Sequence, residues 1–153
     1  MGYGRGPEKV WVYGALRVRD GRALTLTAAS RNTAGYLRLL EAIARANPTG
    51  DLSLIGDNLS SHKSPPVAAW LGAHPRVHQV FIPVGACWLN LQEAWWRLFR
   101  REAVAGQSFV DAAEIEHATR VATAQLNRRA KPWVWNRPPS SPRYRRRAFV
   151  YRL

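Results

Sequence analysis

The sequence predicts one α/β domain built on a mixed sheet. Short apolar segments with β-branched and aromatic residues alternate with longer segments whose apolar residues recur at helical spacing. A short turn joins the first two strands, so an antiparallel hairpin comes before the alternation of strands and helices. At 153 residues, the chain is long enough to bury a core of its own.

The hairpin consists of residues 10–18 and 23–27. Both segments are rich in residues that favour strands, and Asp20 and Gly21 between them are residues that turns favour. We therefore expect the two segments to pair as the first two strands.

The first helix follows the hairpin. Thr33 is predicted as its N-cap, and the helix ends at Asn47-Pro48, because proline cannot continue it. Its apolar stripe consists of Tyr36, Leu37, Leu40 and Ile43. The elements after it are a strand over 52–56, a helix opened by Ser64-Pro65-Pro66, and a strand over 77–82.

Two further helices complete the predicted domain. A long helix runs from about Trp88 to Val104. The next begins at Asp111, forms a capping box with Glu114, and ends near Asn127. The apolar stripe of the long helix consists of Leu91, Trp95, Leu98 and Phe99, whereas its polar face carries Asn90, Glu93, Arg97 and Arg100.

The chain is strongly basic, and its charge is unevenly distributed. It contains 23 Lys and Arg against 10 Asp and Glu, a formal net charge of +13. The segment 128–153 holds nine basic residues and no acidic one. An excess of this size attracts polyanions. We therefore expect a domain over 8–127 and a basic, Pro- and Trp-containing tail over 128–153, which should be extended and only partly ordered.

Some classes of site and location are disfavoured by the composition. Cys87 is the only cysteine, which excludes an intrachain disulfide and a zinc site built on cysteines. The sequence contains neither an apolar signal region nor an apolar run of membrane length. These features predict a cytoplasmic protein with an anionic partner and no membrane association.

Two carboxylates are the candidate catalytic residues. Asp57 ends an apolar strand, and Glu93 lies in the first turns of the long helix. Carboxylates delivered by two different elements can share a divalent metal, and Mg²⁺ or Mn²⁺ suits such oxygen ligands. In a chain this basic, the matching substrate is nucleic acid. The alternatives are that Asp57 belongs to an Asp-Asn turn pair and that Glu93 is a solvated helix residue.

Three sequence patterns together point to a known family. They are Asp57-Asn58-x-x-x-His62-Lys63-Ser64 followed by Pro83, then Trp88-Leu89-Asn90-x-x-Glu93, and Asn127-Arg128-x-x-Lys131-Pro132-Trp133-x-Trp135. In this order they resemble the DDE-type transposases of bacterial insertion sequences related to mariner. The resemblance covers the chain from the hairpin to Trp135. It implies a ribonuclease H-like fold and Mg²⁺-dependent cleavage and strand transfer, with transposon ends and target DNA as partners and a homodimer or larger assembly.

The chain departs from that family at one carboxylate. Family members use Asp, Asp and Glu, and the first Asp lies on the first, central strand. By resemblance Asp57 is the second carboxylate and Glu93 the third, while Asp20 and Asp51 are placed wrongly for the first. The first central strand is therefore expected to be missing. The chain is expected to be a truncated copy or one of two frames joined by frameshifting, and to be nearly inactive alone.

Other residues are candidates for supporting roles. Asn58, His62 and Asn90 are candidates for supporting the site, although His62 also fits a polar loop residue and Asn90 a helix cap. The candidate DNA-binding residues are Lys63, Arg97, Arg128, Arg129, Lys131, Arg143, Arg145, Arg146 and Arg147. In the tail the alternative is unspecific charge with no dedicated role. Two rival functions stay open: a non-catalytic DNA-binding remnant of a transposase, and a basic RNA-binding accessory protein.

Overall fold

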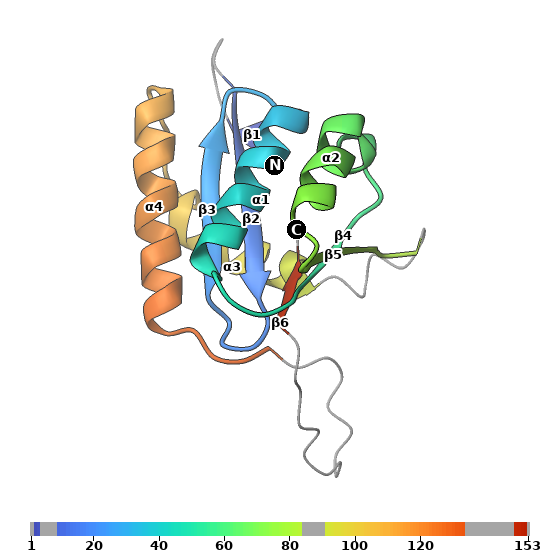
Figure 1. Cartoon of the computed structure of the whole chain (residues 1–153). Helices are drawn as coiled ribbons and strands as arrows, with labels where there is room; N and C mark the ends of the chain where they lie inside the picture. The colour runs from blue at the N-terminus through green and yellow to red at the C-terminus, as the bar shows by residue number, and fades with distance from the viewer. Residues whose placement is uncertain (1, 4–8, 84–90, 134–148, 153) are drawn as a thin grey trace.

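The chain folds around one mixed sheet with helices on both faces (Figure 1). The structure, a computed structural model, describes residues 2–3, 9–83, 91–133 and 149–152. The strands are β1 (Gly2–Tyr3), β2 (Val10–Arg17), β3 (Ala23–Ala28), β4 (Leu52–Gly56), β5 (Val77–Phe81) and β6 (Phe149–Arg152). The helices are α1 (Thr33–Ala46), the 3-10 turn η1 (Ser60–Lys63), α2 (Pro65–Ala73), α3 (Leu91–Ala103) and α4 (Ala112–Arg128).

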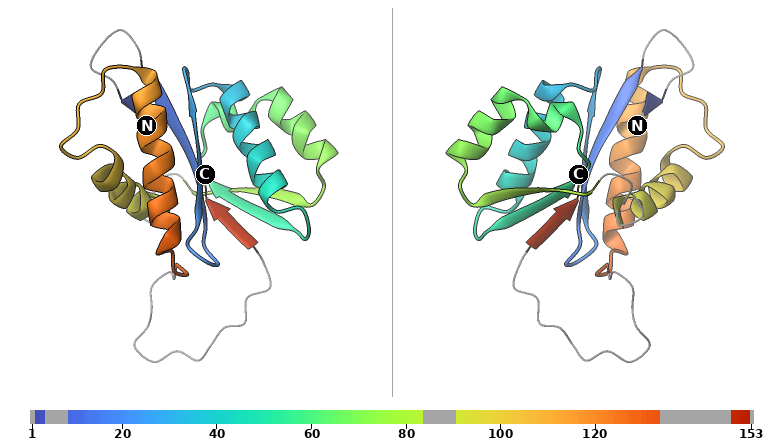
Figure 2. Two further views of the ribbon diagram at one scale, coloured as in Figure 1. Left: turned by 90° about the vertical axis from the view of Figure 1, so that its left-hand side faces the viewer. Right: turned by 90° about the vertical axis from the view of Figure 1, so that its right-hand side faces the viewer.

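The sheet consists of two halves joined by its last strand in the sequence. In the first half β2 pairs antiparallel with β3, from Trp11 opposite Ala28 to Leu16 opposite Ala23. In the second half β4 and β5 run parallel. Between the halves lies β6, antiparallel to β2 and parallel to β4 (Figure 2). The predicted hairpin and the two predicted strands over 52–56 and 77–82 are thus confirmed.

The place of β6 bears on two expectations. The resemblance implied that the first central strand, which carries the first catalytic Asp in the family, is missing. The central position next to β4 is filled instead by β6, which comes last among the described strands and carries no Asp. The expectation that residues 149–152 belong to an extended tail is wrong, because they form this strand. The segment Phe149-Val150-Tyr151 does favour strands, but the arginines around it conceal this preference in the sequence. The division at residue 127 otherwise stays a prediction, and the arginine run at 143–147 lies outside the described residues.

Two apolar cores lie on opposite faces of the sheet. Helices α1 and α2 cover one face, and α3 and α4 cover the hairpin on the other (Figure 2). The first core contains Ala15, Tyr36, Leu39, Leu40, Ile43, Leu52, Leu54, Val67 and Val77. The second contains Val12, Leu16, Ala23, Trp95, Phe99, Ala103, Ala122 and Leu126. Strand β2 serves both cores, because successive side chains of a strand point to opposite faces.

Helix ends follow the predicted boundaries with one correction. The side chain of Asn32, not that of Thr33, caps α1 by accepting from the Gly35 amide at 2.9 Å. Asp111 caps α4 through the Glu114 amide at 2.9 Å, as predicted. Helix α3 is described from Leu91 onward, so the expected start at Trp88 lies outside the described residues. No helix among the described residues combines the length and apolarity that a membrane span requires.

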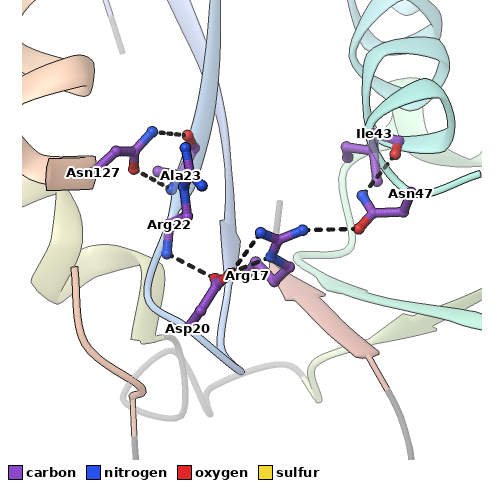
Figure 3. Close-up of polar contacts among 7 residues, drawn as sticks. All are labelled: Arg17, Asp20, Arg22, Ala23, Ile43, Asn47 and Asn127. Atoms are coloured by element: carbon purple, nitrogen blue, oxygen red, sulfur yellow. Dashed lines mark hydrogen bonds and ion pairs between the residues drawn. The ribbon is translucent and has the colours of Figure 1, made fainter.

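Polar side chains tie the hairpin to both helical layers (Figure 3). On one side Asn127 accepts from the Ala23 amide at 2.7 Å and donates to the Ala23 carbonyl at 2.8 Å. On the other side Arg17 binds Asp20 and donates to Asn47 Oδ1 at 3.1 Å. Asn47 in turn donates to the Ile43 carbonyl at the end of α1. These contacts fix the helical layers against the sheet, and with them the elements that carry the site.

Candidate active site

Asp57 stands at the carboxyl end of β4. Strand β4 alternates buried and partly buried residues and ends at Gly56, whose carbonyl accepts from the Ile82 amide at 2.8 Å. Asp57 therefore leaves the sheet at the edge where open α/β sheets form their sites. Its side chain is 56% exposed, so its carboxylate is open to ligands from solvent.

His62 folds back onto Asp57 from the turn η1. Its Nδ1 lies 3.1 Å from the Asp57 carbonyl oxygen and 3.3 Å from Asp57 Oδ1. A carbonyl oxygen can only accept, so Nδ1 carries a proton and donates. Burial of the ring lowers the pKa of His62, and the charge of Arg31 lowers it further. The hydrogen bond to the Asp57 backbone and the Asp57 charge raise this pKa, but by less, so the pKa stays below its ordinary value. His62 therefore holds Asp57 as a neutral donor, and its supporting role in the site stays a prediction.

Tyr36 packs against the ring of His62. The two rings stack with centroids 4.0 Å apart, and the Tyr36 hydroxyl accepts from Gln79 Nε2 at 2.8 Å. Burial, helped by the Asp57 charge, raises the pKa of Tyr36 far above its ordinary value, so the phenol stays neutral. Helix α1 and strand β5 thus fix Tyr36, Tyr36 fixes the His62 ring, and His62 orients Asp57.

Glu93 reaches the same cleft from α3. The helix is held by Trp95 and Phe99 in the second core, and Glu93 is exposed on its other face. The close approach of α3 to β2 depends on Gly14, since a Cβ atom at that position would lie 2.8 Å from the ring of Trp96 on α3. A larger residue at Gly14 would push α3 away from the sheet. The close contact therefore brings Glu93 to the cleft that Asp57 lines.

The cleft has a volume of about 360 Å³ and mixes acidic, basic and aromatic side chains. Besides the two carboxylates it is lined by Arg31 and Arg100 and by the aromatic residues Trp11, Tyr13 and Trp96. Sequence reasoning missed Arg31 and Trp11. Arg31 lies in the loop before α1, outside any periodic pattern, and the position of Trp11 in an apolar segment predicts only a strand residue. The sequence offers no local signal for either.

The remaining predicted residues are spread over the surface. Asn58 is exposed beside Asp57 but is not among the residues that line the cleft, and Lys63 Nζ lies 5.0 Å from the centre of the Phe81 ring. Arg97 is exposed on α3, also outside the cleft lining. Arg128 and Lys131 are exposed near the hairpin, and Arg129 binds Glu102. The candidates Asn90, Arg143, Arg145, Arg146 and Arg147 lie outside the described residues.

The donor set fits a hard cation held by few protein ligands. Asp57 and Glu93 offer carboxylate oxygens in an open cleft, and Mg²⁺ commonly binds through one or two carboxylates while it keeps several waters. Within the described ranges, no group of three or more His, Cys, Asp or Glu side chains could hold a metal ion. A site built on these two residues alone would bind Mg²⁺ or Mn²⁺ weakly.

Comparisons with known proteins bear on the fold and the family of the chain. The catalytic core domain of BIV integrase matches with a TM-score of 0.59 at 17% sequence identity, over 82% of this chain and 79% of that one. The likeness confirms the predicted ribonuclease H-like fold. A search of curated proteins finds no match. The family model described as DDE superfamily endonuclease matches residues 2–116. Since this match covers well over half of the sequence, the chain belongs to the DDE superfamily endonuclease family.

Proposed function

We propose that the chain is a transposase domain from a mariner-related bacterial insertion sequence, and that metal-dependent strand cleavage and strand transfer are activities of the complete enzyme. The observation that supports this most is the cleft shared by Asp57 and Glu93, which two different elements deliver. The basic net charge of +13 suits a DNA substrate. The working form that we propose is a homodimer or larger assembly on transposon ends and target DNA.

The roles of the residues follow from their placement. Asp57 and Glu93 would hold Mg²⁺ or Mn²⁺. His62 Nδ1 donates to the Asp57 backbone carbonyl and lies 3.3 Å from the Asp57 carboxylate. When bound, the metal supplies charge stabilisation for phosphoryl transfer and a lower pKa for bound water. Arg31 and Arg100 line the same cleft, which adds positive charge beside the two carboxylates. Tyr36 and Gln79 keep His62 in place and take no part in proton transfer.

Metal binding is the first test, because it does not depend on turnover. We expect Mn²⁺ titration by calorimetry to give a weak site, with a Kd on the order of 10⁻³ M as for weak oxygen-ligand sites. Asp57→Asn and Glu93→Gln should each abolish it. The matched controls Asp51→Asn and Glu116→Gln, both exposed and outside the cleft lining, should leave it intact. Equal loss in the control variants would contradict the assignment.

Cleavage of supercoiled plasmid in Mg²⁺ or Mn²⁺ is the second test. With two carboxylates we expect nicking at or close to background. Robust cleavage that Asp57→Asn and Glu93→Gln both abolish would show that two carboxylates suffice, or that a further ligand lies outside the described residues. Robust cleavage that survives both substitutions would overturn the proposed site.

A non-catalytic DNA-binding remnant is the second candidate. This alternative is favoured by the small number of metal ligands, since among the described residues no third His, Cys, Asp or Glu side chain forms a metal site together with Asp57 and Glu93. Binding through phosphates would be strongly salt-dependent and independent of sequence. In that case the wild type and Asp57→Asn would retain DNA equally, and neither would bind Mn²⁺. A preference for RNA with indifference to Asp57→Asn would instead favour the RNA-binding alternative.

A further inference from the structure

Arg31 is one of two arginines that line the cleft, beside Arg100, and the proposed metal site does not use it. It is exposed in the loop between β3 and α1, and its guanidinium carbon lies 5.2 Å from the centre of the Trp11 ring. Elsewhere arginines bind acidic residues, as Arg17 binds Asp20 and Arg120 binds Glu116. In the described part of the chain, Arg31 forms no ion pair.

The backbone around Arg31 is held on both sides. The Asn32 amide donates to the Tyr13 hydroxyl at 3.0 Å, and that hydroxyl lies 3.3 Å from the Ser30 carbonyl. The Asn32 side chain is committed to the cap of α1. Strand β2 supplies both Tyr13 and Trp11, so the same strand fixes the loop and the ring beneath the guanidinium. Arg31 therefore projects from a fixed point.

Among the described residues, no acceptor takes the hydrogen-bond donors of Arg31, which lies over the Trp11 ring. A guanidinium carries five N–H donors in its own plane, and an aromatic face satisfies none of them. The planar donor edge matches two phosphate oxygens, which makes arginine suited to bidentate phosphate recognition. A stacked arginine is also partly preorganised, so less side-chain entropy is lost when it binds.

The cleft needs a cation for electrostatic reasons. Asp57 and Glu93 carry two negative charges into a site that must accept a phosphodiester, which is itself an anion. Arg31 lines the same cleft as Asp57 and His62, so its charge acts close to the carboxylates. A fixed positive charge on this wall offsets the repulsion between the carboxylates and the incoming phosphate.

We propose that Arg31, held by stacking on Trp11, binds a phosphodiester of the DNA backbone beside the Asp57–Glu93 cleft. This inference rests on the proposed function, because it takes DNA as the occupant of the cleft. Arg31 is here a substrate-binding residue, and Trp11 is the residue that positions it.

The salt dependence of DNA binding tests the proposal without any need for turnover. Fluorescence anisotropy with a labelled duplex, at a series of salt concentrations and fixed Mg²⁺, gives both affinity and slope. Removing one phosphate contact should lower the slope of log K against log salt by about 1. We expect this for Arg31→Ala, a smaller effect for Arg31→Lys, and an intermediate loss of affinity for Trp11→Leu. The matched control is Arg38→Ala, an exposed α1 residue outside the cleft lining with the same change of charge.

The outcomes separate this proposal from the proposed function. If Arg31→Ala and Arg38→Ala have the same affinity and slope, the role of Arg31 is refuted even if the protein binds Mn²⁺ through Asp57 and Glu93. If Arg31→Ala alone lowers the slope while Mn²⁺ binding is absent, the phosphate contact stands and the metal-dependent function fails. If the wild type does not bind DNA at all, both fail. Urea denaturation of each variant checks that the fold is retained.

Discussion

Asn127→Ala should destabilise the protein far more than an ordinary surface substitution. Asn127 lies in the last turn of α4 and forms two hydrogen bonds with the backbone of Ala23, one to the amide and one to the carbonyl. Ala23 is only 8% exposed and lies on β3, which pairs with β2 alone among the described strands. Alanine at position 127 would leave a backbone donor and acceptor at this edge without their partner.

The expected cost follows from those two groups. A buried polar group left unsatisfied costs about 1–3 kcal/mol, and partial access of water to this edge lowers the sum. We expect a loss of about 2–4 kcal/mol of unfolding free energy, a large part of the roughly 5–15 kcal/mol typical of a domain. For a chain of this size that corresponds to a fall in Tm of roughly 4–16 °C, at about 2–4 °C per kcal/mol.

Urea denaturation at neutral pH measures this change, with the slope of the transition checked for constancy. Gln125→Ala is the matched control, because Gln125 is exposed two residues earlier in the same helix. It should stay within about 0.5 kcal/mol of the wild type. Asn127→Asp keeps an acceptor for the Ala23 amide but no donor for the carbonyl, so it should fall between the two. An Asn127→Ala protein as stable as Gln125→Ala would refute the reasoning.

Three further predictions concern the hairpin and its contacts. Gly14→Ala should displace the Trp96 ring and lower the unfolding free energy by about 1–3 kcal/mol, as overpacking does. Because the displaced ring moves α3, the variant should also bind Mn²⁺ more weakly. Urea denaturation and Mn²⁺ titration of the same variant would detect the two effects. Gly21→Ala should destabilise the fold more than Gly14→Ala, because Gly21 has φ 75° and an added Cβ would meet the backbone of Lys131. Urea denaturation of the two variants compares their unfolding free energies. Burial alone would raise the pKa of Asp20, but hydrogen bonds and charges from Arg17 and Arg22 outweigh it and hold that pKa below its ordinary value. Asp20 therefore contributes stability above the unfolded pKa of about 3.9, and this is lost as pH falls through the folded value. Asp20→Asn should cost about 1 kcal/mol at pH 7, since the pair with Arg17 is partly exposed, and urea curves at a series of pH values should show the difference vanish in acid.

The two proposed catalytic carboxylates could be identified from the sequence for local reasons. Asp57 follows a short apolar strand and Glu93 falls on the polar face of a helix whose other face is apolar, and both features lie within a few neighbouring residues. The same is true of the hairpin, the proline-opened α2 and the capping box of α4. The cap of α1 shows the limit of such reasoning, because Asn32 and Thr33 both have suitable side chains and only the backbone geometry selects Asn32.

Local patterns thus determined most of the elements and the fold class, and they singled out Asp57 and Glu93 as candidates, because periodicity, turn residues and caps act between near neighbours. The tertiary structure alone decided which distant residues meet. It placed β6 beside β4, His62 on Tyr36, and Arg31 over Trp11. These contacts depend on how helices pack and strands pair across the whole chain, and no short stretch of sequence encodes that. The sequence therefore named the carboxylates, whereas the fold supplied the residues that orient them and surround their cleft.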